Sequence, residues 1–315
     1  MADKKIIAIV GATGAQGGGL ARAIAADRSG PFAGRAITRK PDAGKGRALA
    51  SLGLEVVAAD LDDEASLARA FAGAHGVYGV TNYWESLSPE KELAQAGNIA
   101  RAAKSAGVAH VIWSTLEDTR RRIPLSDPRL PTLRGKYKVP HFDAKGEADA
   151  LFAGLPTTFL LPAWYFENLI HFGAGPRKSP GGGLVFALPL GGGKLPGIAT
   201  EDIGRCAYGI FRRGGGMIGK RAGIAGDILS GPEMAAALAR ALGQTVTFFD
   251  MPFDQYRALG FPGADDLGNM FEYQAIFNEE FCRSGRDVAL SRSLNPELQS
   301  FAQWLERNKE KIPIA

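Results

Sequence analysis

Residues 5–17 read Lys5-Ile-Ile-Ala-Ile-Val-Gly11-Ala-Thr-Gly14-Ala-Gln-Gly17, an apolar, β-branched run that meets three spaced glycines. The residues that follow, 15–26, have the apolar spacing of a helix. In such a strand–turn–helix the first glycine permits a tight turn, the second lets the backbone approach a pyrophosphate, and the third lets helix and strand pack closely. The helix N-terminus favours the phosphate charge. The stretch therefore predicts a dinucleotide site formed by Gly11, Ala12, Thr13, Gly14, Ala15, Gln16 and Gly17, with a glycine-rich turn that binds nothing as the alternative.

Short β-branched runs and helical segments alternate along the first half of the chain. Strands are expected at 5–10, 35–38, 55–59, 76–80, 110–114 and 157–161, and helices at 15–26, 43–52, 64–71, 89–106 and 141–152. This alternation is typical of βαβ units, whose crossovers are almost always right-handed. It predicts an α/β fold, in which a Rossmann doubly wound parallel sheet is joined to a smaller α/β C-terminal domain.

The chain of 315 residues is long enough for one dinucleotide-binding domain and a smaller companion. We expect the Rossmann domain at 1–163, with a returning segment at about 198–226, because Thr200-Glu-Asp-Ile203 is typical of a helix start with acidic residues in its first turn. The remaining residues, 164–197 and 227–315, are expected to form a smaller domain on the substrate or partner side. Within it we expect glycine- and proline-rich connections across 173–196, and short helices with a strand near Val246 after residue 230.

The composition, 45% hydrophobic and 22% charged, is that of a folded globular protein and leaves no room for a long disordered tail. No run of about 18 apolar residues occurs and the N-terminus lacks signal-peptide features, so we expect a cytoplasmic protein without membrane contact. Cys206 and Cys282 lie far apart, which indicates neither a disulfide framework nor a metal site. The net charge of +4 is mild, and the basic stretch 120–138 lacks interleaved aromatics and a reading helix. That stretch is expected to be a solvated lid or partner loop rather than a nucleic-acid surface.

The second expected strand ends at Thr38-Arg39-Lys40, where a NAD-specific protein commonly carries an acidic residue for the ribose hydroxyls. Arg39 can instead pair with a 2′-phosphate and stack on the adenine, which favours NADP(H) over NAD(H). An ordinary exposed arginine is the alternative. Asp60 and Leu61 follow the third strand, where side chain and backbone could bracket the adenine, with surface capping as the alternative.

Further motifs, in matching order, resemble the NmrA-like family of atypical short-chain dehydrogenases/reductases, and within it the NADP(H)-sensing branch. They are Val80-Thr-Asn-Tyr-Trp-Glu85, His141-Phe-Asp-Ala-Lys145-Gly-Glu147, Pro162-Ala-Trp-Tyr165-Phe-Glu-Asn168 and the segment 259–271. The resemblance covers nearly the whole chain, although the Arg- and Pro-rich stretch between Glu117 and His141 is longer than in the family. It implies that Thr81, Asn82 and Tyr83 line the ribose and nicotinamide side of the cofactor, that Lys145 hydrogen-bonds the nicotinamide ribose, and that Tyr165, Phe166, Glu167 and Asn168 close over the nicotinamide.

In active short-chain dehydrogenases/reductases, a tyrosine four residues before the lysine transfers the substrate proton. His141 takes that place here, on the same face of the expected helix as Lys145. An imidazole can act as acid or base near neutral pH, although a nearby ammonium disfavours its protonated form. Packing without catalytic duty is the alternative for His141. Ser114, at the end of the fifth expected strand, stands where such enzymes often keep a hydroxyl to orient a carbonyl, so it joins His141 and Lys145 as a candidate catalytic residue.

Two functions are open at this point. The first is a redox sensor, in which NADP(H) binding changes the loops 120–138 and 165–178, or the balance of monomer and homodimer, and so alters binding to a protein partner. The second is an NADPH-dependent oxidoreductase that reduces a quinone, a carbonyl or a related small aromatic substrate, with the proton supplied by His141 or water. Aromatic residues either line a flat slot for such a substrate or pack as core and lid: Tyr83, Trp84, Trp164, Tyr165 and Phe166. The missing tyrosine favours the sensor.

Overall fold

The computed structural model describes residues 4–314, which form two compact units. Within that range the first unit comprises residues 4–118, 144–161 and 200–222, and the second comprises 119–143, 162–199 and 223–314. Residues 119–143, which the sequence analysis placed in the Rossmann domain, thus group with the second unit. The physical reason is a set of hydrogen bonds inside that unit. The buried Asp143 carboxylate accepts from the backbone N–H groups of Thr119, Lys138 and Val139, and the Asn269 amide donates to the carbonyl of Lys138.

The first unit is built on a seven-stranded sheet with the order β11-β6-β5-β4-β1-β2-β3. Its strands are β1 (Lys5–Ile9), β2 (Phe32–Thr38), β3 (Glu55–Ala58), β4 (Gly76–Gly79), β5 (His110–Ser114), β6 (Thr157–Leu161) and β11 (Arg221–Gly223). All pairs from β3 across to β6 are parallel. The strand order reverses between β1 and β4, and ligands of open α/β sheets bind outside the carboxyl ends of the strands at such a switch point. The predicted Rossmann fold class is confirmed.

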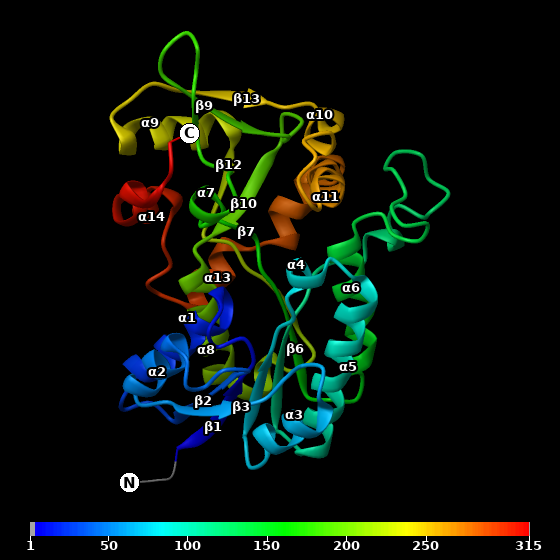
Figure 1. Cartoon of the computed structure of the whole chain (residues 1–315), viewed down its shortest axis with the longest axis vertical. Helices are drawn as coiled ribbons and strands as arrows, with labels where there is room; N and C mark the ends of the chain where they lie inside the picture. Colours follow the sequence, from blue (N-terminus) through cyan, green and yellow to red (C-terminus); the bar gives the residue numbers. More distant parts are fainter. Residues whose placement is uncertain (1–3, 315) are drawn as a thin grey trace. The chain divides into compact units, whose positions relative to one another are not determined.

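Helices cover both faces of this sheet. They are α1 (Ala15–Ala26), α2 (Gly44–Ser51), α3 (Glu64–Phe71), α4 (Tyr83–Ser86), α5 (Pro89–Ser105), α6 (Pro140–Ala148), which runs on from the second unit, and α8 (Thr200–Arg213). Leu67 and Phe71 of α3 and Ile99 of α5 share one buried cluster with Val77 and Trp113 of the sheet. On the opposite face α1 packs against α8, as Figure 1 shows. The sheet is therefore buried on both sides, as its apolar strands require.

The second unit contains two three-stranded sheets, ordered β12-β10-β7 and β13-β9-β8. The strands are β7 (Trp164–Tyr165), β8 (Arg177–Lys178), β9 (Leu184–Leu188), β10 (Lys194–Ile198), β12 (Asp227–Ser230) and β13 (Val246–Asp250). The helices are α7 (Asn168–His171), α9 (Gly231–Leu242), α10 (Phe253–Arg257), α11 (Ala264–Ile276), α12 (Asn278–Glu280), α13 (Val288–Leu294) and α14 (Phe301–Asn308), with a π-helical turn at Phe281–Gly285. Capping boxes start α9, through Ser230 and Glu233, and α14, through Ser300 and Gln303.

Two segments of the second unit are more ordered than the sequence indicated. The glycine- and proline-rich region 173–196 contains β8 and β9 and the start of β10. The basic stretch 120–138, expected to be a solvated loop, buries Ile123, Leu130 and Tyr137, and the Lys138 ammonium donates to the carbonyls of Asp127 and Leu130. The exposed arginines of this stretch therefore belong to a segment that is packed against the protein rather than to a solvated loop. Across residues 4–314, no helix has both the length and the apolar character needed to cross a membrane.

Candidate functional site

The glycine-rich turn has the geometry that its sequence predicts. Gly11 has a φ of +66°, which favours glycine, and a Cβ there would lie 3.0 Å from Cγ1 of Val80. A Cβ at Gly17 would lie only 2.5 Å from the carbonyl oxygen of Gly11, so only glycine lets α1 start this close to β1. Gly14 is the N-cap residue of α1 and has no side chain to cap the helix. Ala12 is buried beneath the turn, Thr13 is half-buried and Ala15 is exposed, so the turn presents backbone rather than side chains.

Gln16 connects the turn to the two central strands. Its Oε1 accepts hydrogen bonds from the Tyr78 hydroxyl at 2.5 Å and from the Ser114 hydroxyl at 2.8 Å. Because a serine hydroxyl has one hydrogen, Ser114 donates that hydrogen inside the protein and keeps only its acceptor capacity. In this arrangement Ser114 orients Gln16 at the base of the turn, and it does not offer a hydrogen to a substrate carbonyl.

Arg39 lies at the end of β2 and pairs with Glu85 of α4 at 2.8 Å, and these two side chains are 60% and 52% exposed. The hydrogen bond that Arg39 donates to Glu85 is the main cause that raises the pKa of Arg39, and the charges of Asp60 and Asp62 act in the same direction. Asp60 also accepts from the N–H of Asp62 at 3.0 Å, so its side chain does cap the local turn. The Leu61 carbonyl accepts from the side-chain amide of Asn98. Arg39 is therefore a solvent-facing cation at this edge with a carboxylate partner.

A buried ion pair lies at the end of β4. Lys145 of α6 contacts the carboxylate of Glu92, with 2.6 Å between Nζ and Oε1, and donates to the hydroxyl and the carbonyl of Thr81 at 2.9 and 3.2 Å. The Thr81 hydroxyl in turn donates to Glu92 at 2.6 Å. Next in the chain, Asn82 is exposed, whereas Tyr83 is buried and packs edge-on against Trp84. The structure thus brings the predicted residues Thr81 and Lys145 together, and adds Glu92 to them.

His141 lies in the second unit, where it forms a pair with Asp266 of α11. Its Nδ1 is 2.6 Å from Oδ1 of Asp266, and its backbone N–H donates to the other carboxylate oxygen at 3.1 Å. The two side chains are 7% and 1% exposed. With Nδ1 as the donor, neutral His141 keeps its hydrogen on Nδ1 and its lone pair on Nε2. This is the arrangement by which a carboxylate orients an acid–base histidine, and it also ties α6 to α11.

The segment Tyr165–Asn168 also belongs to the second unit. Phe166 is buried and packs against Phe301 and Trp304, with ring centroids 5.0 and 5.7 Å apart. The carboxylate of Glu167 accepts from the indole N–H of Trp304 at 3.0 Å, Tyr165 lies half-buried in β7, and Asn168 begins α7. Phe166 therefore has the core-packing role that the sequence left open as an alternative.

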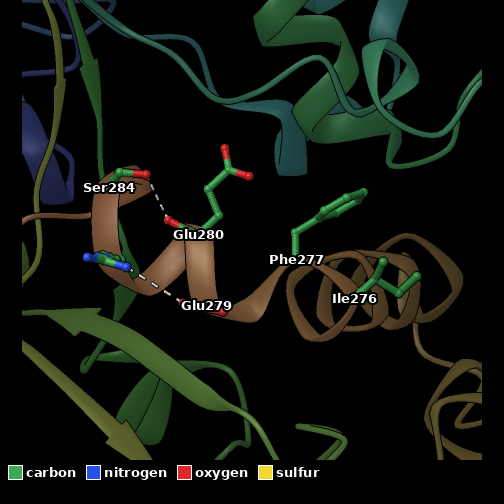
Figure 2. A pocket seen from close by; sticks show the side chains of 6 residues that line it. Ile276, Phe277, Glu279, Glu280 and Ser284 are labelled. Atoms are coloured by element: carbon green, nitrogen blue, oxygen red, sulfur yellow. Dashed lines mark hydrogen bonds and ion pairs between the residues drawn. The ribbon is translucent and has the colours of Figure 1, made fainter.

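An open pocket of about 370 Å³ lies beside the π-helical turn (Figure 2). Its lining residues are Ile276, Phe277, Glu279, Glu280, Arg283 and Ser284. The charges around it are paired, since Glu279 faces Arg283 at 3.7 Å and Glu280 pairs with Arg122, whose guanidinium also lies over the Phe277 ring. None of the residues that the sequence singled out lines this pocket.

The acidic partners of Arg39, Lys145 and His141 are Glu85, Glu92 and Asp266, and the sequence analysis assigned a role to none of them. One of them, Glu92, could have been recognised from the sequence pattern. Glu92 falls on the stripe that continues through Ala96, Ile99 and Ala103, all buried, so an acidic residue stands where the helical spacing requires an apolar one. An acid on such a stripe indicates a buried cation as its partner. Glu85 and Asp266 lie among other polar residues, and only the fold places them beside Arg39 and His141.

The doubly wound sheet and its glycine-rich turn define a Rossmann-type protein, and comparison with known proteins identifies its family. The chain belongs to the NmrA-like family, whose model matches residues 3–304. It is 28% identical to an NmrA-like family domain-containing oxidoreductase from Aspergillus flavus, over 86% of this chain and 84% of that protein. It is 29% identical to an NAD(P)H azoreductase from Xenophilus azovorans, over 79% of this chain and 78% of that protein. The resemblance of the sequence motifs to the NmrA-like family is thereby confirmed, and the assignment to its NADP(H)-sensing branch stays a prediction.

Solved structures share the fold. A structure of NmrA, a negative transcriptional regulator, has a TM-score of 0.78 at 22% identity and covers 96% of this chain and 95% of its own. A structure of an NADPH-dependent quinone oxidoreductase from Escherichia coli, complexed with NADPH, has a TM-score of 0.70 at 23% identity and covers 96% and 99%. A regulator and an enzyme thus share this architecture, so function has to be argued from the site.

Proposed function

We propose that this protein binds NADP(H) along the carboxyl edge of its seven-stranded sheet and is an NADPH-dependent oxidoreductase. The turn Gly11–Gly17 would hold the pyrophosphate, because it presents backbone rather than side chains at the N-terminus of α1. Arg39 would hold the 2′-phosphate, with Asp60 and Leu61 beside the adenine. Thr81, Asn82, Tyr83 and Lys145 would line the nicotinamide ribose.

The observation that carries the enzymatic part is the pair formed by His141 and Asp266. Bound NADPH would supply a hydride, so a two-electron acceptor also needs one proton. The Asp266 carboxylate, 2.6 Å from Nδ1, fixes the orientation of the imidazole, whose Nε2 would pass a proton to the acceptor and recover one from water. His141 precedes Lys145 by one turn of α6, which is the spacing of the acid in active short-chain dehydrogenases/reductases.

The relatives suggest the class of acceptor. The similar proteins include an azoreductase and an NmrA-like oxidoreductase, and the quinone oxidoreductase has the same fold. Azo compounds and quinones are flat, conjugated acceptors that take a hydride and a proton. We therefore propose a quinone or azo compound as the first substrates to test, with a small carbonyl compound as the third.

The test is NADPH oxidation followed by absorbance with a quinone, an azo dye and an aldehyde, for the wild type and for His141→Gln and Asp266→Asn. Both substitutions should lower kcat by about tenfold or more, because the proton donor or its orientation is lost, and should leave the Kd for NADPH within about twofold. His171→Gln is the matched control, since His171 is exposed in the same unit. Normal turnover by His141→Gln would remove that residue as the proton donor.

A redox sensor that acts through a protein partner is the second candidate. Ser114 donates its hydroxyl hydrogen to Gln16, and the Lys145 ammonium has three protein acceptors, so neither group is poised for a substrate. Tight NADPH binding with no acceptor-dependent consumption, together with a nucleotide-dependent change in association state, would favour the sensor. Failure to bind any nicotinamide dinucleotide would contradict both candidates.

A further inference from the structure

The buried carboxylate of Glu92 needs a function that explains its burial. It is 1% exposed, in the first turn of α5, on the helix face that otherwise packs apolar residues against the sheet. A buried carboxylate costs several kcal/mol of solvation unless a cation and hydrogen bonds compensate for it. Lys145 and Thr81 supply this compensation, and a well-packed apolar pair would stabilise the fold as well or better. Stability alone therefore does not explain the pair.

The pair of Lys145 and Glu92 carries no net charge, and every hydrogen of the ammonium group has an acceptor within the protein. The Lys145 ammonium has three hydrogens and three acceptors, namely Oε1 of Glu92 and the hydroxyl and carbonyl oxygens of Thr81. To reach a ribose hydroxyl, Lys145 has to give up one of these acceptors. The Thr81 carbonyl, at 3.2 Å, is the most distant and is uncharged, so it is the acceptor that a ribose hydroxyl would replace. Glu92 then stays paired with Lys145 while the cofactor is bound.

We infer that Glu92 is a positioning residue that sets the relative affinities of the site for NADP⁺ and NADPH. This inference rests on the proposed binding of NADP(H), with Lys145 at the nicotinamide ribose. The oxidised nicotinamide ring carries a positive charge and the reduced ring carries none, so a nearby charge changes the affinity for the two forms unequally. Glu92 cancels the Lys145 charge, and the site can then hold the oxidised cofactor without repulsion from a buried cation.

The charges predict opposite effects for the two partners. Glu92→Gln leaves the lysine charge uncompensated, which disfavours NADP⁺ relative to NADPH. Lys145→Gln leaves the carboxylate uncompensated, which favours NADP⁺ relative to NADPH. If the pair had only a structural role, both variants would bind NADP⁺ and NADPH more weakly by the same factor. The sign of the change in relative affinity therefore separates an electrostatic role from a structural one.

The experiment measures the Kd of the full chain for NADP⁺, NADPH and 2′,5′-ADP by calorimetry. The ratio of the Kd for NADP⁺ to the Kd for NADPH should rise on the order of tenfold in Glu92→Gln and fall by a similar factor in Lys145→Gln. The Kd for 2′,5′-ADP, which lacks the nicotinamide, should change by less than about twofold in Glu92→Gln.

Two control variants accompany the charge variants. Glu90→Gln makes the same charge change at an exposed position of the same helical turn and should leave the ratio unchanged. Thr81→Val disturbs the hydrogen bonds of the cluster without changing its charge, and should weaken both cofactor forms by the same factor. If Glu92→Gln does not fold, the comparison of Lys145→Gln, which changes the charge, with Thr81→Val, which does not, still tests the inference. An unchanged ratio in the charge variants overturns the inference, whereas absence of binding to the wild type overturns the proposed function instead.

Discussion

At the residue scale, the cation proposed for the 2′-phosphate already has a partner. Arg39 and Glu85 form an ion pair between two side chains that are both more than half exposed. Exposed pairs of this kind contribute roughly 0–1 kcal/mol, whereas a phosphate offers a bidentate, doubly charged acceptor. A 2′-phosphate can therefore displace Glu85 at small cost. Glu85 would thus act as a weak competitor for the site rather than as a barrier to it.

The corresponding prediction concerns cofactor choice. Arg39→Ala should weaken NADPH binding by about tenfold or more and leave NADH binding nearly unchanged, because only NADPH carries the 2′-phosphate. Glu85→Gln should strengthen NADPH binding by up to about fivefold, since a competitor of roughly 1 kcal/mol is removed. Calorimetric titration of both nucleotides checks this, with Arg47→Ala as the exposed control in α2. Equal losses of NADPH and NADH affinity in Arg39→Ala would assign the arginine to a different part of the cofactor.

At the element scale, glycines decide how closely α1 approaches its neighbours. A Cβ at Gly204 of α8 would overlap the backbone N of Leu20 and the carbonyl carbon of Gly19. Both atoms are backbone in the adjacent helix, so neither can move aside as a side chain could. The close crossing of α1 and α8 matters for the site because α1 carries the Gly11–Gly17 turn at its N-terminus.

Gly204→Ala should therefore destabilise the protein by about 1–3 kcal/mol, the usual cost of overpacking a close contact, and should weaken dinucleotide binding as α1 shifts. Urea unfolding followed by circular dichroism checks the first effect, and nucleotide titration checks the second. Gly216→Ala is the control, because a Cβ there would meet nothing within 4 Å. A Gly204→Ala variant as stable as the wild type would show that α8 can move away from α1 freely.

Local patterns predicted most elements of the first unit and, in the second unit, the strand near Val246, which is β13. The expected helices 15–26 and 64–71 and the strand 110–114 have the observed bounds, because each has a regular apolar period and each strand pairs with a neighbour in a repeated βαβ order. β9 was missed, since its partner β13 lies about sixty residues further along the chain and glycines flank it. The flanking glycines favour a loop, although the burial of Leu184–Leu188 alternates as in a strand.

The candidate site divides in the same way. The turn at Gly11 and the cation Arg39 could be predicted because each comes directly after an expected strand, and strand ends can be located from the sequence alone. The partners Glu85 and Asp266 act through contacts between residues 46 and 125 positions apart in the chain, and their motifs give no spacing rule for such pairs. Only Glu92, an acid on an apolar helix stripe, could have been found from the pattern.

At the scale of the whole molecule, one buried histidine links folding of the first unit to pH. His110 is almost fully buried in β5, and its Nε2 lies 2.8 Å from the Thr158 hydroxyl, which itself donates to the Met217 carbonyl. Because the hydroxyl hydrogen is already used, Nε2 is the donor to the Thr158 oxygen. Burial lowers the pKa of His110 to about 4, with a smaller contribution from the charge of His75.

This linkage predicts that acid destabilises the fold. The unfolded chain binds a proton at this histidine below about pH 6.5, whereas the folded chain does so only near pH 4, so the unfolded state holds more protons between these values. The free energy of unfolding should therefore fall as the pH drops through this window, by about 3 kcal/mol in total from this one group. Urea unfolding at a series of pH values from 7.5 to 4.5 measures the slope of the free energy of unfolding against pH.

His110→Asn should be less stable at neutral pH but should lose most of this slope, while His171→Asn, altered at an exposed position, should keep it. An undiminished slope in His110→Asn would mean that other groups, such as protonating carboxylates, cause the acid sensitivity.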